Sequence, residues 1–180
     1  EKPDYIHQAI RSILKQTHRD LELILVPDDP ENMPVISLLQ EYEARDQRVT
    51  VLENEKNLGL PGALNKALKV ARGDYIARMD ADDISHPERF EVQLQYMREH
   101  NLDLVGTRKR CIDEQGELLP GRESTYYSPK MVMKQLRWAD CLPHSTWLAK
   151  REVYDLLEGY RDMPRSEDFD FLLRALNRGF

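Results

Sequence analysis

Hydrophobic and polar residues along this chain follow two patterns, one with the period of an amphipathic helix and one typical of a short buried strand. The two patterns alternate regularly through residue 107. Helices are predicted to begin near Asp4, Pro34, Pro61 and Pro87, with Gly73 closing the third, and strands are predicted over residues 21–26, 49–52, 75–79 and 102–107. Such alternation predicts an α/β fold with a mostly parallel sheet and helices on both faces.

The regular alternation ends after Arg108. A turn around Gly116 predicts a hairpin over residues 110–118, and Ser145 to Ala149 predicts a strand at the edge of the sheet. Further helices are predicted around residues 129–136, over 151–157 and over 167–178, the last of them capped by Ser166. At 180 residues, the chain is long enough for one domain with a sizeable core.

Acidic residues gather where two of the predicted strands end. The strand over residues 75–79 is followed by Asp80, Asp82 and Asp83, and an earlier strand is followed by Asp28 and Asp29. In an open α/β sheet the ligand crevice lies outside the carboxyl ends of the strands. Carboxylates this close repel one another unless a cation shares them, so the later cluster predicts a site for Mg²⁺ or Mn²⁺ beside a diphosphate. Ordinary Asp-rich turns explain both clusters as an alternative.

Composition and charge narrow the class of protein. The net charge of −6, with no basic face evident in the sequence, argues against nucleic acid as a partner. No apolar run approaches the ~18 residues that a membrane span needs, so we expect a soluble domain. Cys111 and Cys141 lack zinc-like spacing, which favours free buried thiols in a reducing, cytoplasmic compartment.

Four motifs follow one another along the chain. They read S-I-L-K-Q-T-H-R-D-L-E-L-I-L-V-P-D-D (residues 12–29), N-L-G-L-P-G-A-L-N-K-A-L (57–68), A-R-G-D-Y-I-A-R-M-D-A-D-D (71–83) and S-E-D-F-D-F-L-L-R (166–174). In this order they resemble the family 2 glycosyltransferases, whose fold is the Rossmann-like GT-A fold. The resemblance implies a single domain over residues 1–180, with a nucleotide-binding part over 1–108 and an acceptor-side part over 109–180. Because family members usually open with an apolar strand that is not seen here, we expect a fragment of a longer enzyme with the first strand missing.

The resemblance implies a nucleotide-sugar site at the two acidic strand ends. In the family, the residues that match Asp28 and Asp29 contact the nucleotide base, usually uridine. The D-x-D motif that matches Asp80 and Asp82 serves the ribose and the metal. Asp82 and Asp80 are therefore the expected ligands of Mn²⁺ or Mg²⁺, and Asp83 is expected to have a supporting role.

The resemblance also implies roles outside the acidic clusters. Asn57 and Asn65 lie in the loop and helix that resemble the wall of the sugar-nucleotide pocket. The alternatives are a loop turn, which explains Asn57 at least as well, and a solvent-facing helix position for Asn65. The S-E-D match implies that Asp168 is the general base of an inverting transfer, with a first-turn acid on a capped helix as the alternative. His144 matches a position near the acceptor cleft, although a lone His is more often structural, and Arg174 is expected to hold the acidic cluster or line the diphosphate side.

Together these expectations describe a metal-dependent inverting glycosyltransferase. It would move a sugar from a nucleotide-sugar, expected to be a UDP-sugar, to a hydroxyl of a glycan or lipid-linked acceptor, in synthesis of cell-surface polysaccharides or glycoconjugates. We expect a cytoplasmic enzyme, at the inner face of the membrane for a lipid-linked acceptor, with any peripheral membrane association through segments outside this sequence.

Two other functions stay open at the level of sequence. One is a catalytically silent nucleotide-binding module that keeps the fold without turnover. The other is a receiver-like phosphoacceptor domain, because Leu23 to Val26 followed by two acids resembles the first strand of such a domain. The absence of a suitable lysine on the last strand counts against the receiver.

Overall fold

The computed structural model describes residues 2–123, 125, 127–163 and 165–180. Helices and strands alternate through its first part, as the hydrophobic pattern predicts. The elements are, in order, α1 (Pro3–Leu14), β1 (Leu23–Leu25), α2 (Met33–Arg45), β2 (Val49–Val51), α3 (Gly59–Val70), β3 (Tyr75–Ala77), α4 (Arg89–His100), β4 (Leu104–Val105), β5 (Arg110–Ile112), β6 (Leu118–Glu123), α5 (Pro129–Gln135), the 3₁₀ helix η1 (His144–Thr146), β7 (Leu148–Lys150), α6 (Arg151–Leu157) and α7 (Glu167–Arg178).

The strands pair in three small sheets. β1 and β2 are parallel, with Leu23 opposite Val49, and β5 and β6 form an antiparallel hairpin. β7 runs antiparallel between β3 and β4, so the order of the third sheet is β3-β7-β4. The α/β class is confirmed, but the pairing is mixed rather than mostly parallel because β7 enters between two strands that run the other way. The prediction of an edge strand over residues 145–149 is wrong. The observed strand, β7, lies in the centre of its sheet, and the first two residues of the predicted range belong to η1 instead.

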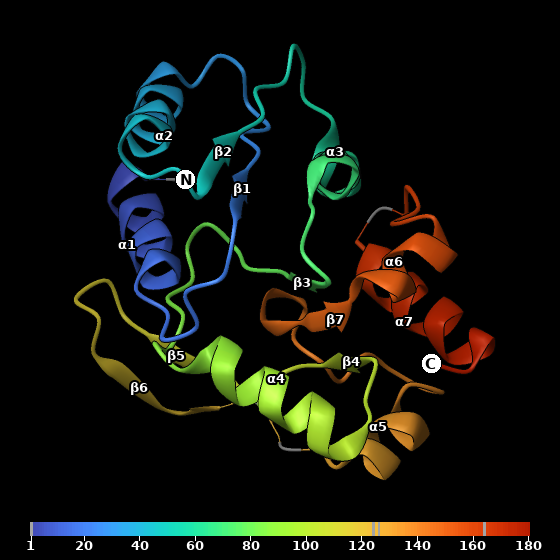
Figure 1. Cartoon of the computed structure of the whole chain (residues 1–180). Coiled ribbons are helices and arrows are strands. Elements are labelled where there is room, and N and C mark those ends of the chain that lie inside the picture. The colour runs from blue at the N-terminus through green and yellow to red at the C-terminus, as the bar shows by residue number, and fades with distance from the viewer. Residues whose placement is uncertain (1, 124, 126, 164) are drawn as a thin grey trace.

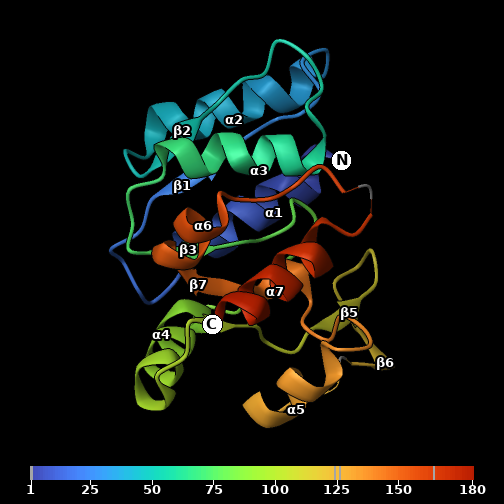
Figure 2. The same ribbon diagram turned by 90° about the vertical axis from the view of Figure 1, so that its right-hand side faces the viewer.

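Helices cover both faces of the β1-β2 pair and of the β3-β7-β4 sheet, as expected (Figures 1 and 2). Helices α1 and α2 lie on one side of the β1-β2 pair and α3 lies on the other. On β7, Leu148 packs with Leu94 and Met97 of α4, whereas the next residue, Ala149, packs in the cluster that contains Phe171 of α7. Neighbouring residues of a strand point to opposite faces, so this one strand joins two helical layers.

The larger hydrophobic core lies in the C-terminal part of the chain. Trp147 and Phe171 are both fully buried and stack with a ring-centroid distance of 5.9 Å, and Tyr154 lies 4.8 Å from Phe171. A smaller core holds α1 against α2 through Ile10 and Leu39. Aromatic side chains bury the most apolar area per residue, so the C-terminal core rigidly positions β7 and the start of α7.

Several helix ends differ from the prediction. Pro3, whose ring fixes the helical φ angle, begins α1 and leaves Asp4 in the first turn rather than at the cap. α3 starts at Gly59 and ends before Ala71, not at Gly73. Ser166 occupies the N-cap position of α7, but its hydroxyl makes no capping hydrogen bond.

Two expectations concern compartment and membrane. Cys111 and Cys141 are free, as predicted, but half-buried rather than buried. Within the described ranges, none of the helices has both the length and the apolar composition needed to cross a membrane.

Candidate functional site

Asp28 follows β1 and is oriented by two neutral donors. Its Oδ1 accepts a hydrogen bond from Nδ2 of Asn54 at 3.0 Å and another from the backbone N–H of Leu58 at 2.7 Å. Asn54 is buried, and its own Oδ1 accepts a hydrogen bond from Nζ of Lys66 at 2.8 Å. The donors fix the direction of the carboxylate and leave Oδ2 without a protein partner among the described residues, so it can accept an N–H from a ligand.

Asp29 and Asn57 lie in turns near Asp28. Oδ1 of Asp29, which is exposed, accepts a hydrogen bond from the backbone N–H of Glu31 at 3.1 Å. Oδ1 of the exposed Asn57 accepts one from Gly59 at 3.0 Å, at the start of α3 where the φ angle of Gly59 is +69°. Both side chains therefore shape loops, and their contact with a nucleotide stays a prediction.

Asp80 follows β3 and is paired with a buried arginine. Nη2 of Arg78 lies 2.5 Å from Oδ1 of Asp80, and the two side chains are 7% and 43% exposed. Nε of Arg78 is buried and has no hydrogen-bond partner among the described residues. A buried guanidinium is tolerated only when it is paired, so Asp80 is needed by the local fold while its exposed side stays accessible to a ligand.

A second buried arginine fixes the strand that carries Arg78. Nη2 of Arg89 donates to the backbone carbonyls of Arg78 at 2.9 Å and Trp147 at 3.2 Å, and its Nε donates to Gln93 at 2.9 Å. Gln93 in turn donates to the carbonyl of Thr146 at 2.8 Å. Burial lowers the pKa of Arg89 to about 10, so it stays charged at neutral pH. This network joins α4 to the residue after β3 and to the residues just before β7, close to the turn at Asp80.

The D-x-D segment offers hard oxygen ligands but no complete cage. Asp82 is exposed, two positions after Asp80. Among the described residues, no group of three or more His, Cys, Asp or Glu side chains could hold a metal ion. Mg²⁺ usually takes one or two protein carboxylates and completes its shell with water and substrate phosphates. Two carboxylates at the end of β3 fit that chemistry, and they fit Mn²⁺ in the same way.

His144 lies in the core beneath this site. Its Nε2 is 2.9 Å from the hydroxyl of Tyr160, which lies 3.3 Å from the hydroxyl of Tyr154. Burial, and then the positive charge of Arg78, lower the pKa of His144 to about 3. The imidazole is therefore neutral at physiological pH and its hydrogen bond is structural, which is the alternative that the sequence left open.

Asp168 lies in the first turn of α7, half-buried, with Oδ1 accepting a hydrogen bond from the backbone N–H of Phe169 at 2.7 Å. Its negative charge affects the pKa of two other residues. Burial raises the pKa of Tyr160 and that of Asp140, and the charge of Asp168 raises both further. Asp140 also accepts a hydrogen bond from the backbone N–H of Leu142 at 3.0 Å.

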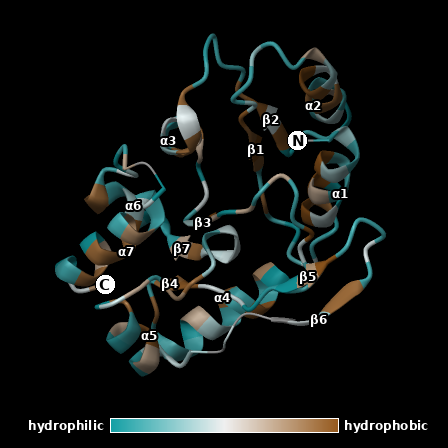
Figure 3. Cartoon of the chain, turned by 180° about the vertical axis from the view of Figure 1, so that it is seen from behind, coloured by the Kyte–Doolittle hydropathy of each residue, from teal (hydrophilic) through white to brown (hydrophobic). Residues whose placement is uncertain are grey.

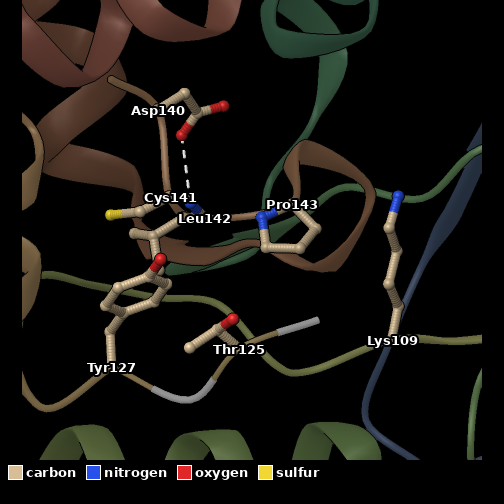
Figure 4. Close-up of a pocket in the computed structure, with 7 residues that line it drawn as sticks. All are labelled: Lys109, Thr125, Tyr127, Asp140, Cys141, Leu142 and Pro143. Carbon is tan, nitrogen blue, oxygen red and sulfur yellow. Dashed lines mark hydrogen bonds between the residues drawn. The ribbon is translucent and has the colours of Figure 1, made fainter. Parts of the chain in front are cut away.

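An open pocket of about 280 Å³ adjoins Asp140 (Figure 4). Its lining mixes a basic, an acidic, an aromatic and small polar and apolar side chains: Lys109, Thr125, Tyr127, Asp140, Cys141, Leu142 and Pro143. Asp140, whose pKa is raised by burial and then by the charge of Asp168, is the acidic residue of this lining.

Asn65 and Arg174 hold the loop that carries Tyr160. Asn65 exchanges two hydrogen bonds with the backbone of Tyr160, both of 2.8 Å. A Cβ on Gly159, whose φ angle is +73°, would lie within clashing distance of Oδ1 of Asn65. Arg174 pairs with Asp170 at 2.7 Å and donates to the carbonyl of Gly159 at 2.9 Å. Contact of Asn65 with a donor stays a prediction, because the structure shows its amide used by the loop.

These contacts bring two of the motifs to the loop of Tyr160. Asn65 of the second motif binds the backbone of Tyr160, and Arg174 of the fourth binds the carbonyl of Gly159. Asp28 contacts the N-terminal end of α3, the helix that carries Asn65, because its carboxylate accepts the hydrogen bond from the backbone of Leu58. Sequence reasoning missed Arg78; a charged residue within an otherwise apolar strand was the signal that could have revealed it.

Two solved structures share the fold of this chain. A mannosyltransferase from Pyrobaculum calidifontis, in complex with GDP-Man and Mn²⁺, has a TM-score of 0.74 at 19% identity and is matched over 100% of this chain and 50% of its own. TarS of S. aureus in complex with UDP has a TM-score of 0.73 at 20% identity, over 96% of this chain and 51% of its own. The fold is therefore the GT-A fold of glycosyltransferases.

The family follows from the sequence comparison. The model of glycosyl transferase family 2 matches residues 1–157, and this chain belongs to that family. An uncharacterized glycosyltransferase of Methanocaldococcus jannaschii is 34% identical over 98% of this chain and 61% of its own length. The O-antigen biosynthesis glycosyltransferase WbnJ of Escherichia coli is 37% identical over 96% of this chain and 67% of its own length. The chain thus spans about two thirds of these relatives, and Asp168 lies beyond the residues that the family model matches.

Proposed function

We propose that this chain is the catalytic domain of a metal-dependent inverting glycosyltransferase that uses a nucleotide-sugar, with a UDP-sugar as the first choice. The observation that carries the proposal is the match of residues 1–157 to glycosyl transferase family 2, together with the acidic residues at the strand ends, where Asp28 is oriented by Asn54 and Leu58 and Asp80 is paired with Arg78. The names of two relatives, an O-antigen biosynthesis glycosyltransferase and a chondroitin synthase, support an acceptor of polysaccharide type.

The donor side, over residues 1–108, would bind the nucleotide. Asp28 has a fixed carboxylate whose Oδ2 would accept an N–H of the base, and Asp29 lies beside it. Asp80 would contact the ribose, and together with Asp82 it would hold Mn²⁺ or Mg²⁺. The cation would neutralise the diphosphate as it leaves. Solved relatives of the fold bind GDP-Man with Mn²⁺, UDP and UDP-GlcNAc, which supports a nucleotide-sugar donor without choosing the base.

The acceptor side, over residues 109–180, would supply the base. The carboxylate of Asp168 takes the proton of the acceptor hydroxyl as that oxygen attacks the anomeric carbon. The bond from this carbon to the diphosphate oxygen breaks, and its electron pair leaves with the nucleotide, so the configuration inverts.

The proposal includes a location. For a lipid-linked acceptor, the enzyme would act at the cytoplasmic face of the membrane. The free thiols of Cys111 and Cys141 fit a reducing compartment.

Titration of UDP into the chain by calorimetry, with and without Mn²⁺, tests the donor site. We expect binding that Mn²⁺ strengthens, and we expect Asp82→Ala to remove that strengthening. The matched control is Asp155→Ala, which removes an exposed aspartate of α6 and should bind UDP as the unmodified chain does. Equal binding with and without Mn²⁺ in all three proteins would overturn the metal assignment.

Asp168→Asn tests the base. The amide keeps the shape of the side chain but cannot take a proton, so sugar transfer should fall by roughly 100- to 10,000-fold while UDP binding is unchanged. Unchanged turnover would refute the assignment. UDP binding without any transfer by the unmodified chain would instead favour the catalytically silent module.

A further inference from the structure

The segment around α5 has a surface unlike the rest of the chain. The chain carries a net charge of −6, yet residues 127–139 contain Lys130, Lys134 and Arg137 and no acidic residue. All three basic side chains are exposed, and none forms an ion pair within the described part of the chain. The net charge of the whole chain gives no sign of a basic surface, but this segment has one.

Large apolar side chains are exposed beside these charges. Trp138 is 83% exposed, Met131 is 49% exposed and Met133 is 45% exposed. Leu136 points the other way and is 4% exposed, in the C-terminal core, so α5 is anchored to the domain. Figure 3 shows both hydrophilic and hydrophobic residues on α5. We call the six exposed side chains, Lys130, Met131, Met133, Lys134, Arg137 and Trp138, the α5 face.

Helix α5, which carries most of this face, lies away from the N-terminal layers. Both views place α5 at the end of the molecule opposite α2 (Figures 1 and 2). The segment that carries it also connects Tyr127 with Asp140, which both line the pocket described above. Whatever binds the α5 face would therefore sit next to that pocket.

We propose that the α5 face docks on the surface of an anionic lipid bilayer. Lipid head groups with negative charge complement the three basic side chains, and each basic residue near such a surface strengthens binding by roughly fivefold. Trp prefers the level of the head groups, where its ring is apolar and its N–H is hydrated. Met131 and Met133 would enter the boundary with the acyl chains while Lys130 and Lys134 extend toward the phosphates.

The chemistry of the face distinguishes a bilayer from other occupants. The centres of protein interfaces are depleted in lysine, whereas this face combines two lysines and an arginine with apolar residues. A second copy of the chain would bring two basic faces together, which like charges oppose. An anionic surface that is itself part polar and part apolar matches the face best.

Fluorescence reports this contact directly, because the chain has two tryptophans and Trp147 is fully buried. The chain is mixed with vesicles of phosphatidylcholine alone or with 30 mol% phosphatidylglycerol (about one anionic lipid in three), and binding is also measured by co-sedimentation. We expect binding to the anionic vesicles only, weakened by salt, with a blue shift of Trp138 and quenching by lipid brominated in its acyl chains. The shift and the quenching should vanish in Trp138→Phe.

Matched charge variants complete the test. Lys130→Gln, Lys134→Gln and Arg137→Gln combined should weaken vesicle binding by on the order of 100-fold. Lys15→Gln, Lys69→Gln and Arg98→Gln combined remove the same charge from other exposed positions and should leave binding within about threefold. Circular dichroism confirms that both variants fold.

Several outcomes would overturn the proposal. They are no binding to anionic vesicles, equal binding to neutral vesicles, equal loss in both charge variants, or binding without quenching of Trp138. Concentration-dependent dimerisation that Trp138→Phe abolishes, or tight binding of a single-stranded oligonucleotide that displaces vesicles, would assign the face to those partners instead. Vesicle binding needs no sugar donor, so this proposal and the transferase activity can fail separately.

Discussion

Asp28 and Asp80 each follow a short strand, but the protein holds them by different chemistry. Asp28 accepts hydrogen bonds from the amide of Asn54 and the backbone of Leu58, both neutral. Asp80 is held by the charge of Arg78, whose side chain is only 7% exposed. The same residue type at the same place in the fold therefore has two roles, one as an oriented acceptor and one as the counter-ion of a buried cation.

The difference bears on what each carboxylate can bind. The two hydrogen bonds to Asp28 both go to Oδ1, so Oδ2 can accept a donor without giving up either of them. A cation that approaches Asp80 must share the carboxylate with Arg78, and the guanidinium has nowhere to rehydrate. The turn at Asp80 is thus coupled to the stability of the core, whereas the turn at Asp28 is not.

The largest expected effect is that of Asp80→Asn. The amide leaves Arg78 buried without a counter-ion, and removal of one partner of a buried ion pair costs about 3 kcal/mol or more. Denaturant unfolding, monitored in the absence of nucleotide and metal, should show this loss in the free energy of unfolding.

The control is the same change in a chain without the guanidinium. In Arg78→Met, the half-exposed Asp80 is hydrated, so adding Asp80→Asn should change the free energy of unfolding by less than about 1 kcal/mol. If Asp80→Asn costs as much in the Arg78→Met background as in the unmodified chain, the ion pair is not the reason and the contrast with Asp28 fails.

The sequence predicts the helices and strands of this chain better than it predicts how the strands pair. The hydrophobic pattern predicts the elements through α4 in type and order, because each has either a clear helical stripe or a short apolar run that ends in turn residues. It also predicts α6 and α7 with their observed bounds. It misplaces β7 at the sheet edge because a pattern of three residues cannot show which strands will flank it; only the packing of Leu148 on α4 and Ala149 on the opposite core decides that.

Long-range polar contacts are the least predictable from the sequence. Arg89 and Trp147 come from distant parts of the chain, yet the guanidinium of Arg89 donates a hydrogen bond to the carbonyl of Trp147 at 3.2 Å. Asn65 is a candidate ligand because its motif resembles a pocket wall, whereas the structure bonds its amide to the backbone of Tyr160. Local periodicity carries no information about such partners, since they depend on which loops meet after the layers pack.

A second prediction uses pH to extend the comparison into the core. The pKa of His144 is about 3 in the folded chain and 6.5 as its ordinary value. Below pH 6.5 the unfolded chain binds a proton that the folded chain does not, so the stability present above pH 6.5 is lost progressively as the pH falls toward 3. At about pH 5 the loss should be about 2 kcal/mol.

His144→Gln supplies the control for the pH effect. Glutamine keeps a hydrogen-bonding group near Tyr160 but does not titrate. The variant should have lower stability at neutral pH and a smaller decrease between about pH 7 and about pH 5 than the unmodified chain. Parallel pH curves for the two proteins would show that carboxylates, not His144, cause the acid sensitivity.

The smallest expected effect is that of Asp28→Asn, the isosteric counterpart of the change at Asp80. The oxygen of the introduced amide can still accept the hydrogen bonds from Asn54 and Leu58, and no buried cation is left unpaired. What is lost is the extra strength of a hydrogen bond to a charged acceptor, about 1 kcal/mol in the free energy of unfolding. Denaturant unfolding of both isosteric variants side by side measures the contrast. A loss at Asp28 as large as that at Asp80 would mean that both strand ends depend on charge, and that neutral donors alone do not orient the first carboxylate.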